Sequence, residues 1–159
     1  MTLEKDHQRK SYSNPLANRY ASRSMSYLFS EENRIINWRK LWITLAKSER
    51  ALGLDITEQQ IKEMEENLEN IDYDLIGEEE KRLRHDVMSN VYAFARICPL
   101  ASPIMHLGAT SCFVTDNTDL IIMKEALKML TLKITSLIAT LKDFCLKNIE
   151  IPCMKHALS

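Results

Sequence analysis

Between Ser111 and Asn148 the chain contains no glycine and no proline. Apolar residues recur through this stretch at helical spacing, which predicts one long helix. At about 1.5 Å per residue, such a helix is about 55 Å long. That length exceeds what a compact domain of this size can cover. The long helix therefore needs partners, either from sequence that this chain lacks or from other subunits.

The rest of the chain is also poor in residues that form turns. Its 159 residues include only 3 Gly and 4 Pro. Because all-β and α/β folds need a turn every few residues, this scarcity favours a few long helices. The length suggests one domain, or one domain with part of another. We therefore predict an all-α fold.

Local signals place several helix ends. Ser30 is a good N-cap ahead of an apolar period that ends near Gly53, a natural helix terminator. Thr57 and Gln60 have the spacing of a capping box, which predicts a second, shorter helix. Residues 72–96 also have helical character. Asp86 there could cap a restart, so two helices are expected to meet around residues 84–86.

Composition excludes several classes of function. The chain has 21 Lys and Arg against 22 Asp and Glu, a net charge of −1, so charge alone predicts binding neither to nucleic acid nor to a membrane. No run of about 18 apolar residues predicts a membrane span. Residues 1–18 are expected to be a flexible lead-in, and residues 1–14 lack the apolar stretch of a signal peptide. These features predict a cytoplasmic location.

Cysteines and histidines do not form a metal-binding pattern. No C-x-x-C pair occurs and the imidazoles are scattered, which argues against a zinc site. We expect reduced thiols, most of them ordinary buried residues. The residues concerned are Cys98, Cys112, Cys145, Cys153, His7, His85, His106 and His156.

A polar turn precedes the long helix, with the sequence His106-Leu-Gly-Ala-Thr-Ser111. Gly108 allows a tight turn or the close approach of a ligand. Thr110 and Ser111 place hydroxyls and backbone N–H groups where the helix begins, and a helix start is a natural anion site. Helix capping is the alternative role for this pair, and both roles can coexist. His106 either donates to a ligand or caps backbone carbonyls.

A second polar cluster is Arg84-His85-Asp86. If the helix breaks here, Arg84 can bind a phosphate or carboxylate and Asp86 can orient His85 or accept from ligand hydroxyls. The alternative is a salt-bridged helix terminus. Upstream, Arg19 and Tyr20 can hold a phosphate and cover a base, although the pair is a weak signal alone.

Several segments together resemble the adenylosuccinate lyase family of the fumarase/aspartase superfamily. They are residues 19–22 (Arg-Tyr-Ala-Ser), 78–88 (Glu-Glu-Glu-Lys-Arg-Leu-Arg-His-Asp-Val-Met), 106–111 and 116–119 (Asp-Asn-Thr-Asp). Residues 38–42 (Trp-Arg-Lys-Leu-Trp) and 68–72 (Leu-Glu-Asn-Ile-Asp) resemble the animal-type branch. The resemblance runs from about Pro15 to Pro152, and its motifs occur in the family's order and separation.

The resemblance implies a helical domain at residues 19–110, followed at 111–159 by the start of a central bundle of long helices in a homotetramer. It also implies a β-elimination that releases fumarate from adenylosuccinate, giving AMP, and from the succinyl-aminoimidazole-carboxamide ribotide of purine synthesis. No metal or organic cofactor is needed. A base removes a proton next to a succinyl carboxylate, an acid protonates the departing nitrogen, and placed donors stabilise the carbanion.

Residue by residue, the resemblance assigns nucleotide binding to Arg19 and Tyr20 and to Arg84, His85 and Asp86. Thr110 and Ser111 resemble the pair that holds a succinyl carboxylate. His85 is a binding residue first and a catalytic acid second. His106 is a further candidate.

The chain departs from the family pattern near its end. The family's catalytic histidine lies in a Thr-His-x-Gln-Pro motif after the proline that matches Pro152, but Leu158 stands in its register here. His156 is out of register and is not assigned. Family active sites are shared among three subunits, so we expect this chain alone to be inactive. The alternatives are a truncated isoform that acts as a helical interaction protein on the full-length enzyme, and an unstable fragment.

Overall fold

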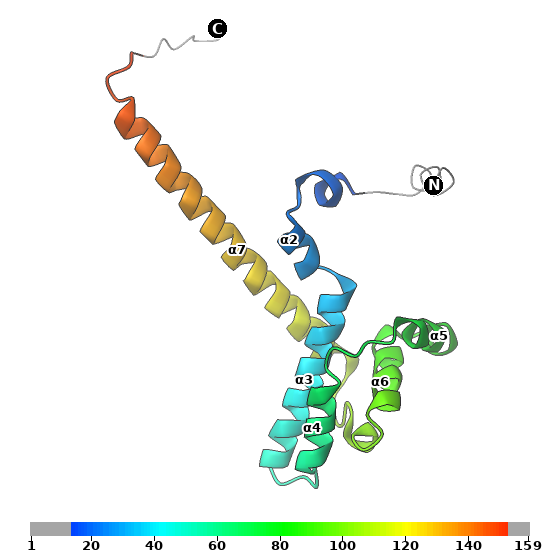
Figure 1. Cartoon of the computed structure of the whole chain (residues 1–159). Helices are drawn as coiled ribbons and strands as arrows, with labels where there is room; N and C mark the ends of the chain where they lie inside the picture. The colour runs from blue at the N-terminus through cyan, green and yellow to red at the C-terminus, as the bar shows by residue number, and fades with distance from the viewer. Residues whose placement is uncertain (1–13, 153–159) are drawn as a thin grey trace, which may run out of the picture. The chain divides into compact units, whose positions relative to one another are not determined.

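A computed structural model describes residues 14–152 of the chain, and this part is helical throughout with no strand (Figure 1). The predicted all-α fold is thereby confirmed. The elements are the π-helical turn η1 (Leu16–Tyr20), α2 (Arg23–Leu28), α3 (Glu31–Ala51), α4 (Glu58–Glu66), α5 (Tyr73–Leu83), α6 (Asp86–Ile97), the 3₁₀ turn η2 (Ser102–Ile104) and α7 (Ser111–Lys147).

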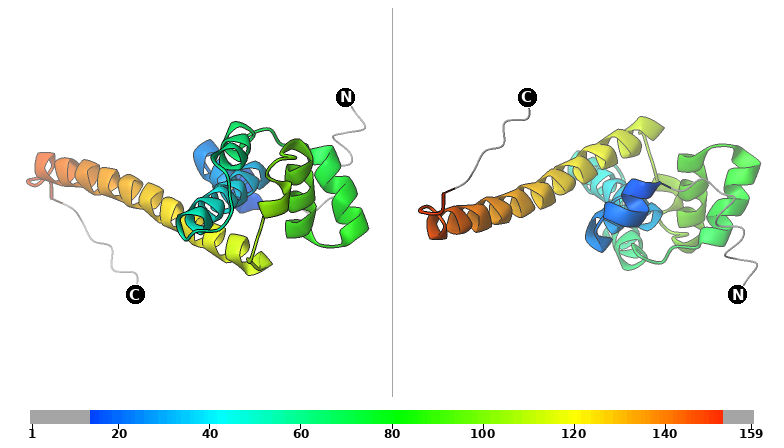
Figure 2. Two further views of the ribbon diagram at one scale, coloured as in Figure 1. Left: turned by 90° about the horizontal axis from the view of Figure 1, so that it is seen from below. Right: turned by 90° about the horizontal axis from the view of Figure 1, so that it is seen from above.

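Helix α3 begins and ends, and helix α4 begins, where the local signals predict. The Ser30 hydroxyl accepts from the Asn33 N–H at 3.2 Å, and α3 ends just before Gly53, whose φ is +95°. Thr57 and Gln60 form the predicted capping box at the start of α4. The two helices lie side by side in the first unit of the chain (Figures 1 and 2).

The predicted break between α5 and α6 is confirmed, but its capping residue is not the predicted one. Arg84 ends α5 in the left-handed conformation, with φ 53° and ψ 37°. His85, rather than Asp86, is the N-cap of α6, and its Nδ1 accepts from the Met88 N–H at 3.3 Å. Asp86 is the first helical residue, so its carboxylate lies too far into the helix to take the N-cap position. The two helices lie side by side (Figures 1 and 2).

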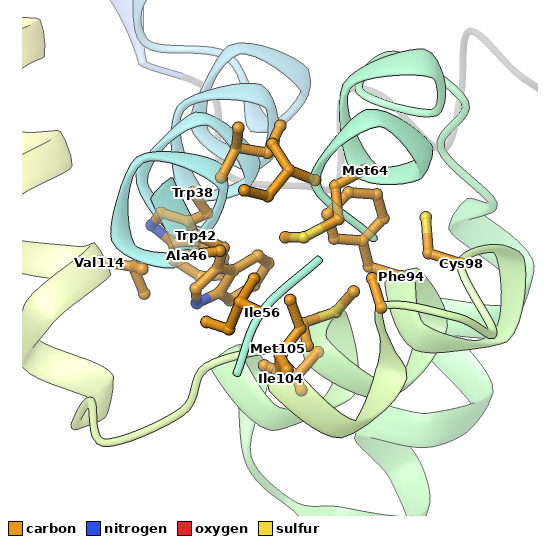
Figure 3. Close-up of a cluster of buried hydrophobic side chains, with 14 of the residues drawn as sticks. Trp38, Trp42, Ala46, Ile56, Met64, Phe94, Cys98, Ile104, Met105 and Val114 are labelled. Atoms are coloured by element: carbon orange, nitrogen blue, oxygen red, sulfur yellow. The ribbon is translucent and has the colours of Figure 1, made fainter. Parts of the chain in front are cut away.

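One hydrophobic core joins α3, α4, α6 and the segment that leads to α7. Figure 3 shows Trp42 of α3 among Met64, Phe94 and Met105, side chains from three other parts of the chain. Trp42 is 1% exposed, and its ring lies 6.3 Å from the Phe94 ring in a stacked arrangement. Because aromatic side chains bury large areas, this cluster anchors α3 to the rest of the first unit.

Helix α7 has 37 residues and crosses the division of the chain into two compact units, which falls between Ile122 and Met123. In the first unit, Val114, Thr118 and Ile122 of α7 are buried at a spacing of four residues. In the second unit, every residue from Leu130 to Lys147 is exposed. The predicted long helix is present, while the predicted domain boundary at residues 110 and 111 stays a prediction.

The structure also bears on three further expectations, which concern the cysteines, the N-terminal residues and membrane spans. Of the described cysteines only Cys98 is buried, since Cys112 and Cys145 lie on exposed positions of α7, so the expectation of mostly buried cysteines is wrong. Residues 16–18 of the predicted flexible lead-in lie in the helical turn η1, while residues 1–13 lie outside the described part. Cys153, His156, Leu158 and His7 also lie outside it. Within residues 14–152, no helix is long and apolar enough to cross a membrane.

Candidate functional site

Two of the predicted site residues share an uncommon backbone conformation. Arg84 has φ +53° and His106 has φ +60°, and they are the non-glycine residues with positive φ within residues 14–152. Side chains on Cβ make this region costly, so such residues gather where surrounding structure holds them for a purpose. Strain of this kind thus marks both polar clusters that the sequence singled out.

At the junction of α5 and α6, the backbone separates the three polar side chains of the first cluster. Arg84, His85 and Asp86 are all exposed. Asp86 Oδ1 accepts from the Val87 N–H at 2.8 Å and lies 3.7 Å from His85 Nδ1. That nitrogen already accepts from Met88, so it has no proton to give to Asp86. The Met88 N–H at the start of α6 thus contacts the His85 ring, and the suggested role of Asp86 in orienting that ring stays a prediction.

His106 is bound to the core through one ring nitrogen, while its suggested role as a donor to a ligand stays a prediction. The Trp42 Nε1–H donates to His106 Nδ1 at 3.0 Å, and the two rings meet edge to face with centroids 6.0 Å apart. Burial, and then the nearby charge of His85, lower the pKa of His106. His106 is therefore a half-buried, neutral imidazole attached to the core, with Nε2 as its N–H group.

The two polar clusters are separated in the sequence by α6 and η2, and both belong to the compact unit that ends at Ile122. Each ring uses Nδ1 to accept a protein N–H, from Met88 and from Trp42. In the neutral state each therefore offers an Nε2–H donor. Two such donors in one neighbourhood suit an anionic ligand.

A carboxylate that sequence reasoning missed lies beside the turn. Gly108 has φ +62°, and a Cβ built on it would lie 3.7 Å from Glu49 Oε1. The other oxygen, Glu49 Oε2, is buried and has no hydrogen-bond partner among the described residues. Burial raises the pKa of Glu49. Glu49 lies two turns beyond Trp42 on α3. This helical spacing is the local signal that could have placed Glu49 on the same side of α3 as Trp42.

Thr110 and Ser111 lie at the start of α7, as predicted. The Thr110 carbonyl accepts from the Phe113 N–H at 3.0 Å, and the Ser111 carbonyl accepts from Thr115 Oγ1 at 3.3 Å. Thr110 is exposed and Ser111 half-buried. The first N–H groups of a helix lack intrahelical acceptors. This end of α7 therefore presents donors directly after the His106 turn.

Arg19 and Tyr20 are the predicted site residues that the structure does not bring to the others. Both are exposed at the end of η1, and within residues 14–152 neither forms a hydrogen bond, ion pair or ring contact with the two polar clusters. A π-helical turn is rare and often marks a functional position. The pair thus remains a candidate on its own segment.

Two hollows of the described surface lie away from the candidate site residues. One of about 410 Å³ is lined by Lys47, Arg50, Ala51, Glu58 and Ile61, where an Arg50–Glu58 ion pair joins α3 to α4. The predicted site is instead a set of exposed donors around His85, His106 and the start of α7. Among residues 14–152, no group of three or more His, Cys, Asp or Glu side chains could hold a metal ion.

Comparison with known proteins finds similarity to adenylosuccinate lyases. The chain is 48% identical over 143 residues to that of Schistosoma mansoni, with 90% of this chain and 30% of the relative covered. It is 46% identical over 147 residues to that of Schizosaccharomyces pombe, covering 91% and 30%. Identity to that of Pyrococcus abyssi is 28% over 142 residues, covering 88% and 31%. No family model matches the chain. The chain thus spans about 30% of the length of these curated relatives.

Proposed function

Because this chain belongs to the adenylosuccinate lyase family, we propose that it supplies the nucleotide-binding part of a lyase active site. The reaction is the β-elimination of fumarate from adenylosuccinate, which gives AMP, and from the succinyl-aminoimidazole-carboxamide ribotide. The observation that carries this proposal is the start of α7, where the hydroxyls of Thr110 and Ser111 and the first backbone N–H groups of the helix directly follow the His106 turn.

The substrate carries a phosphate and two succinyl carboxylates, so its recognition needs several donors. Arg84 and His85 bind one anionic group from the α5–α6 junction, and Asp86 accepts from sugar hydroxyls. Thr110 and Ser111, at the positive end of α7, hold a succinyl carboxylate with hydroxyls and backbone N–H groups. Arg19 and Tyr20 complete the nucleotide contact from η1.

The costly species in this elimination is a carbanion whose charge spreads onto the adjacent carboxylate. Donors aimed at that carboxylate stabilise the transition state more than the substrate, and this difference is what accelerates the reaction. Thr110 and Ser111 are the donors placed for this role. His85 binds first, and acts second as an acid toward the departing nitrogen, because its Nε2 carries the proton. No metal or organic cofactor enters this scheme.

The exposed stretch of α7 supports an assembly in which other chains complete the site. Leu130, Ile134, Leu137, Leu141 and Phe144 recur at helical spacing, and each is at least 45% exposed. Such a stripe buries itself against other helices. We propose a homo-oligomer, a tetramer as in the family, or assembly with a complete enzyme. A cytoplasmic location and a place in purine nucleotide synthesis belong to the same proposal.

Since the chain spans about 30% of its relatives, we expect the 159 residues alone to show no turnover. The test measures fumarate release from adenylosuccinate by the purified chain, next to AMP binding by calorimetry. The proposal predicts binding without turnover, and weaker binding for His85→Gln. Turnover near that of a complete lyase would contradict the part-site proposal, and wild-type binding by His85→Gln would remove His85 from it.

A second candidate function is that of a non-catalytic interaction protein acting on the complete enzyme. The observation in its favour is again the continuous exposure of residues 130–147. Co-expression with a complete adenylosuccinate lyase decides between the two. Mixed assemblies with reduced fumarate release support an inhibitory partner, whereas mixed assemblies with undiminished activity support a contribution to shared sites.

A further inference from the structure

We propose that Trp42 is a positioning residue of the candidate site, because its indole N–H holds His106 in the tautomer that presents Nε2–H to an anionic group of the substrate. The inference rests on the function proposed above, in which an anionic nucleotide is the ligand. It adds a residue from the hydrophobic core that neither the motifs nor the comparisons assign to the site.

The hydrogen bond itself determines the tautomer. Trp42 Nε1 lies 3.0 Å from His106 Nδ1, and an indole nitrogen can only donate. His106 Nδ1 must therefore accept, and the single proton of the neutral ring is on Nε2. A free imidazole in water exchanges between both tautomers, whereas this contact leaves one. The ring thus has a donor fixed in place before any ligand arrives.

Trp42 can impose this geometry because the core holds its own ring. The side chain is 1% exposed and lies between Trp38, at 6.5 Å between ring centroids, and Phe94, at 6.3 Å. A second constraint acts on His106 from its backbone, whose φ is +60°. A side chain fixed at both ends loses little further freedom on binding a ligand, which favours affinity.

The same face of α3 contacts the turn a second time. Trp42, Ala46 and Glu49 follow one another at helical spacing, and Glu49 Oε1 is the atom that a Cβ at Gly108 would approach. A side chain on residue 108 would be strained at φ +62° in any case. Residues of α3 thus lie against the turn at both His106 and Gly108, on the side of the turn that faces the core.

His85 offers a useful contrast. Its Nδ1 accepts from the backbone N–H of Met88, a donor that no substitution other than proline removes. The tautomer of His106 depends instead on a side chain, so it can be tested by mutation. The chain also provides a matched control, since Trp38 lies one turn away on α3 and its buried Nε1–H has no hydrogen-bond partner among the described residues.

The experiment records ¹⁵N spectra of the histidine rings in the full 159-residue chain and in Trp42→Phe and Trp38→Phe. Each variant keeps an aromatic ring and loses an indole N–H. In the wild type we expect His106 Nδ1 without a proton and coupled through the hydrogen bond to Trp42. Trp42→Phe should mix the tautomers and raise the pKa of His106, while Trp38→Phe should leave both unchanged.

Binding gives the second readout. With AMP as the probe, Trp42→Phe should weaken binding by about five- to tenfold, the equivalent of one hydrogen bond. Trp38→Phe should bind like the wild type. A protonated Nδ1 in wild-type His106 overturns the inference without any variant, so it stays testable if Trp42→Phe fails to fold. If the spectra are as expected but no form of the chain binds AMP, Trp42 still determines the His106 tautomer, and the proposed nucleotide site is rejected.

Discussion

Arg39 shows how a single residue can organise the core through polar contacts. It is 1% exposed, and its Nη1 donates to the carbonyls of Asn67, Leu68 and Asn70 at 2.8, 3.1 and 2.9 Å. Its guanidinium lies 4.3 Å from the centre of the Phe94 ring. Burial lowers the pKa of Arg39 to about 10, so the group stays charged at neutral pH. The cation therefore satisfies the carbonyls that end α4.

We expect Arg39→Met to lower the free energy of unfolding by about 3 kcal/mol, because buried carbonyl acceptors lose their donor. Urea unfolding followed by circular dichroism measures this change. The control is Lys40→Met, an adjacent and exposed position, where the change should stay within about 0.5 kcal/mol. Equal effects of the two variants would show that the contacts of Arg39 contribute no net stability.

His106 also predicts a pH dependence of stability. Its pKa is lowered in the fold by burial and by His85, while in the unfolded chain it returns to about 6.5. The unfolded state therefore binds more protons in the window below that value, so stability falls as the pH falls through it. Glu49, the carboxylate beside the turn, has a raised pKa and the opposite slope. The opposite pH dependences of stability due to His106 and Glu49 therefore arise from the same turn.

His106→Gln isolates the imidazole contribution, because a glutamine oxygen can still accept from Trp42 but does not titrate. Urea unfolding between about pH 5 and pH 8 covers the range in which histidine changes charge. The wild type should lose more stability on acidification than the variant. Parallel curves would mean that His106 titrates alike in the folded and unfolded states.

At the scale of elements, the junction between α5 and α6 places a non-glycine residue in the left-handed conformation. Helices often end in a left-handed residue, which is usually glycine because it has no Cβ. Here the position belongs to Arg84, a predicted ligand of the substrate. A glycine would suit this backbone conformation better than an arginine, so Arg84 carries a conformational cost at the end of α5.

Arg84→Gly should raise the free energy of unfolding by about 1 kcal/mol, the cost of the left-handed conformation for a residue with a Cβ. Arg84→Ala keeps that cost and should leave stability nearly unchanged. Both variants lose the guanidinium and should weaken AMP binding equally in calorimetry. If the glycine variant is instead less stable than the alanine variant, the junction is not strained.

At the scale of the whole chain, the main feature is the stripe of exposed apolar residues on α7. From Leu130 to Lys147 every residue is exposed, although leucine, isoleucine and phenylalanine recur throughout. Burying one such side chain contributes about 2 kcal/mol. Several together therefore provide a strong drive toward association with other helices.

We expect the purified chain to sediment as an oligomer at micromolar concentration. The double variant Leu137→Lys with Leu141→Lys should weaken association by at least about tenfold, because two charges would need to be buried. Thr140→Lys is the control, since it adds a charge to an exposed polar position of the same helix. A wild-type chain that sediments as a monomer would contradict the proposed assembly.

The sequence by itself determined the helices and most of their ends. Ser30, Thr57 and the break at residues 84–86 were readable because a cap acts within one turn of its own helix, so its signal is local. The length of α7 followed from the absence of glycine and proline. The site motifs were readable for a related reason, since the residues of each cluster are neighbours in the chain.

Only the tertiary structure decided how these pieces meet. Trp42 donates to a histidine 64 residues away, and Arg39 reaches carbonyls 28 to 31 residues away. The helical period identifies a buried face but not the partner that covers it. The exposure of Cys112 and Cys145 depended likewise on packing. Contacts between distant residues arise from the competition of all buried surfaces at once, and no local pattern records its outcome.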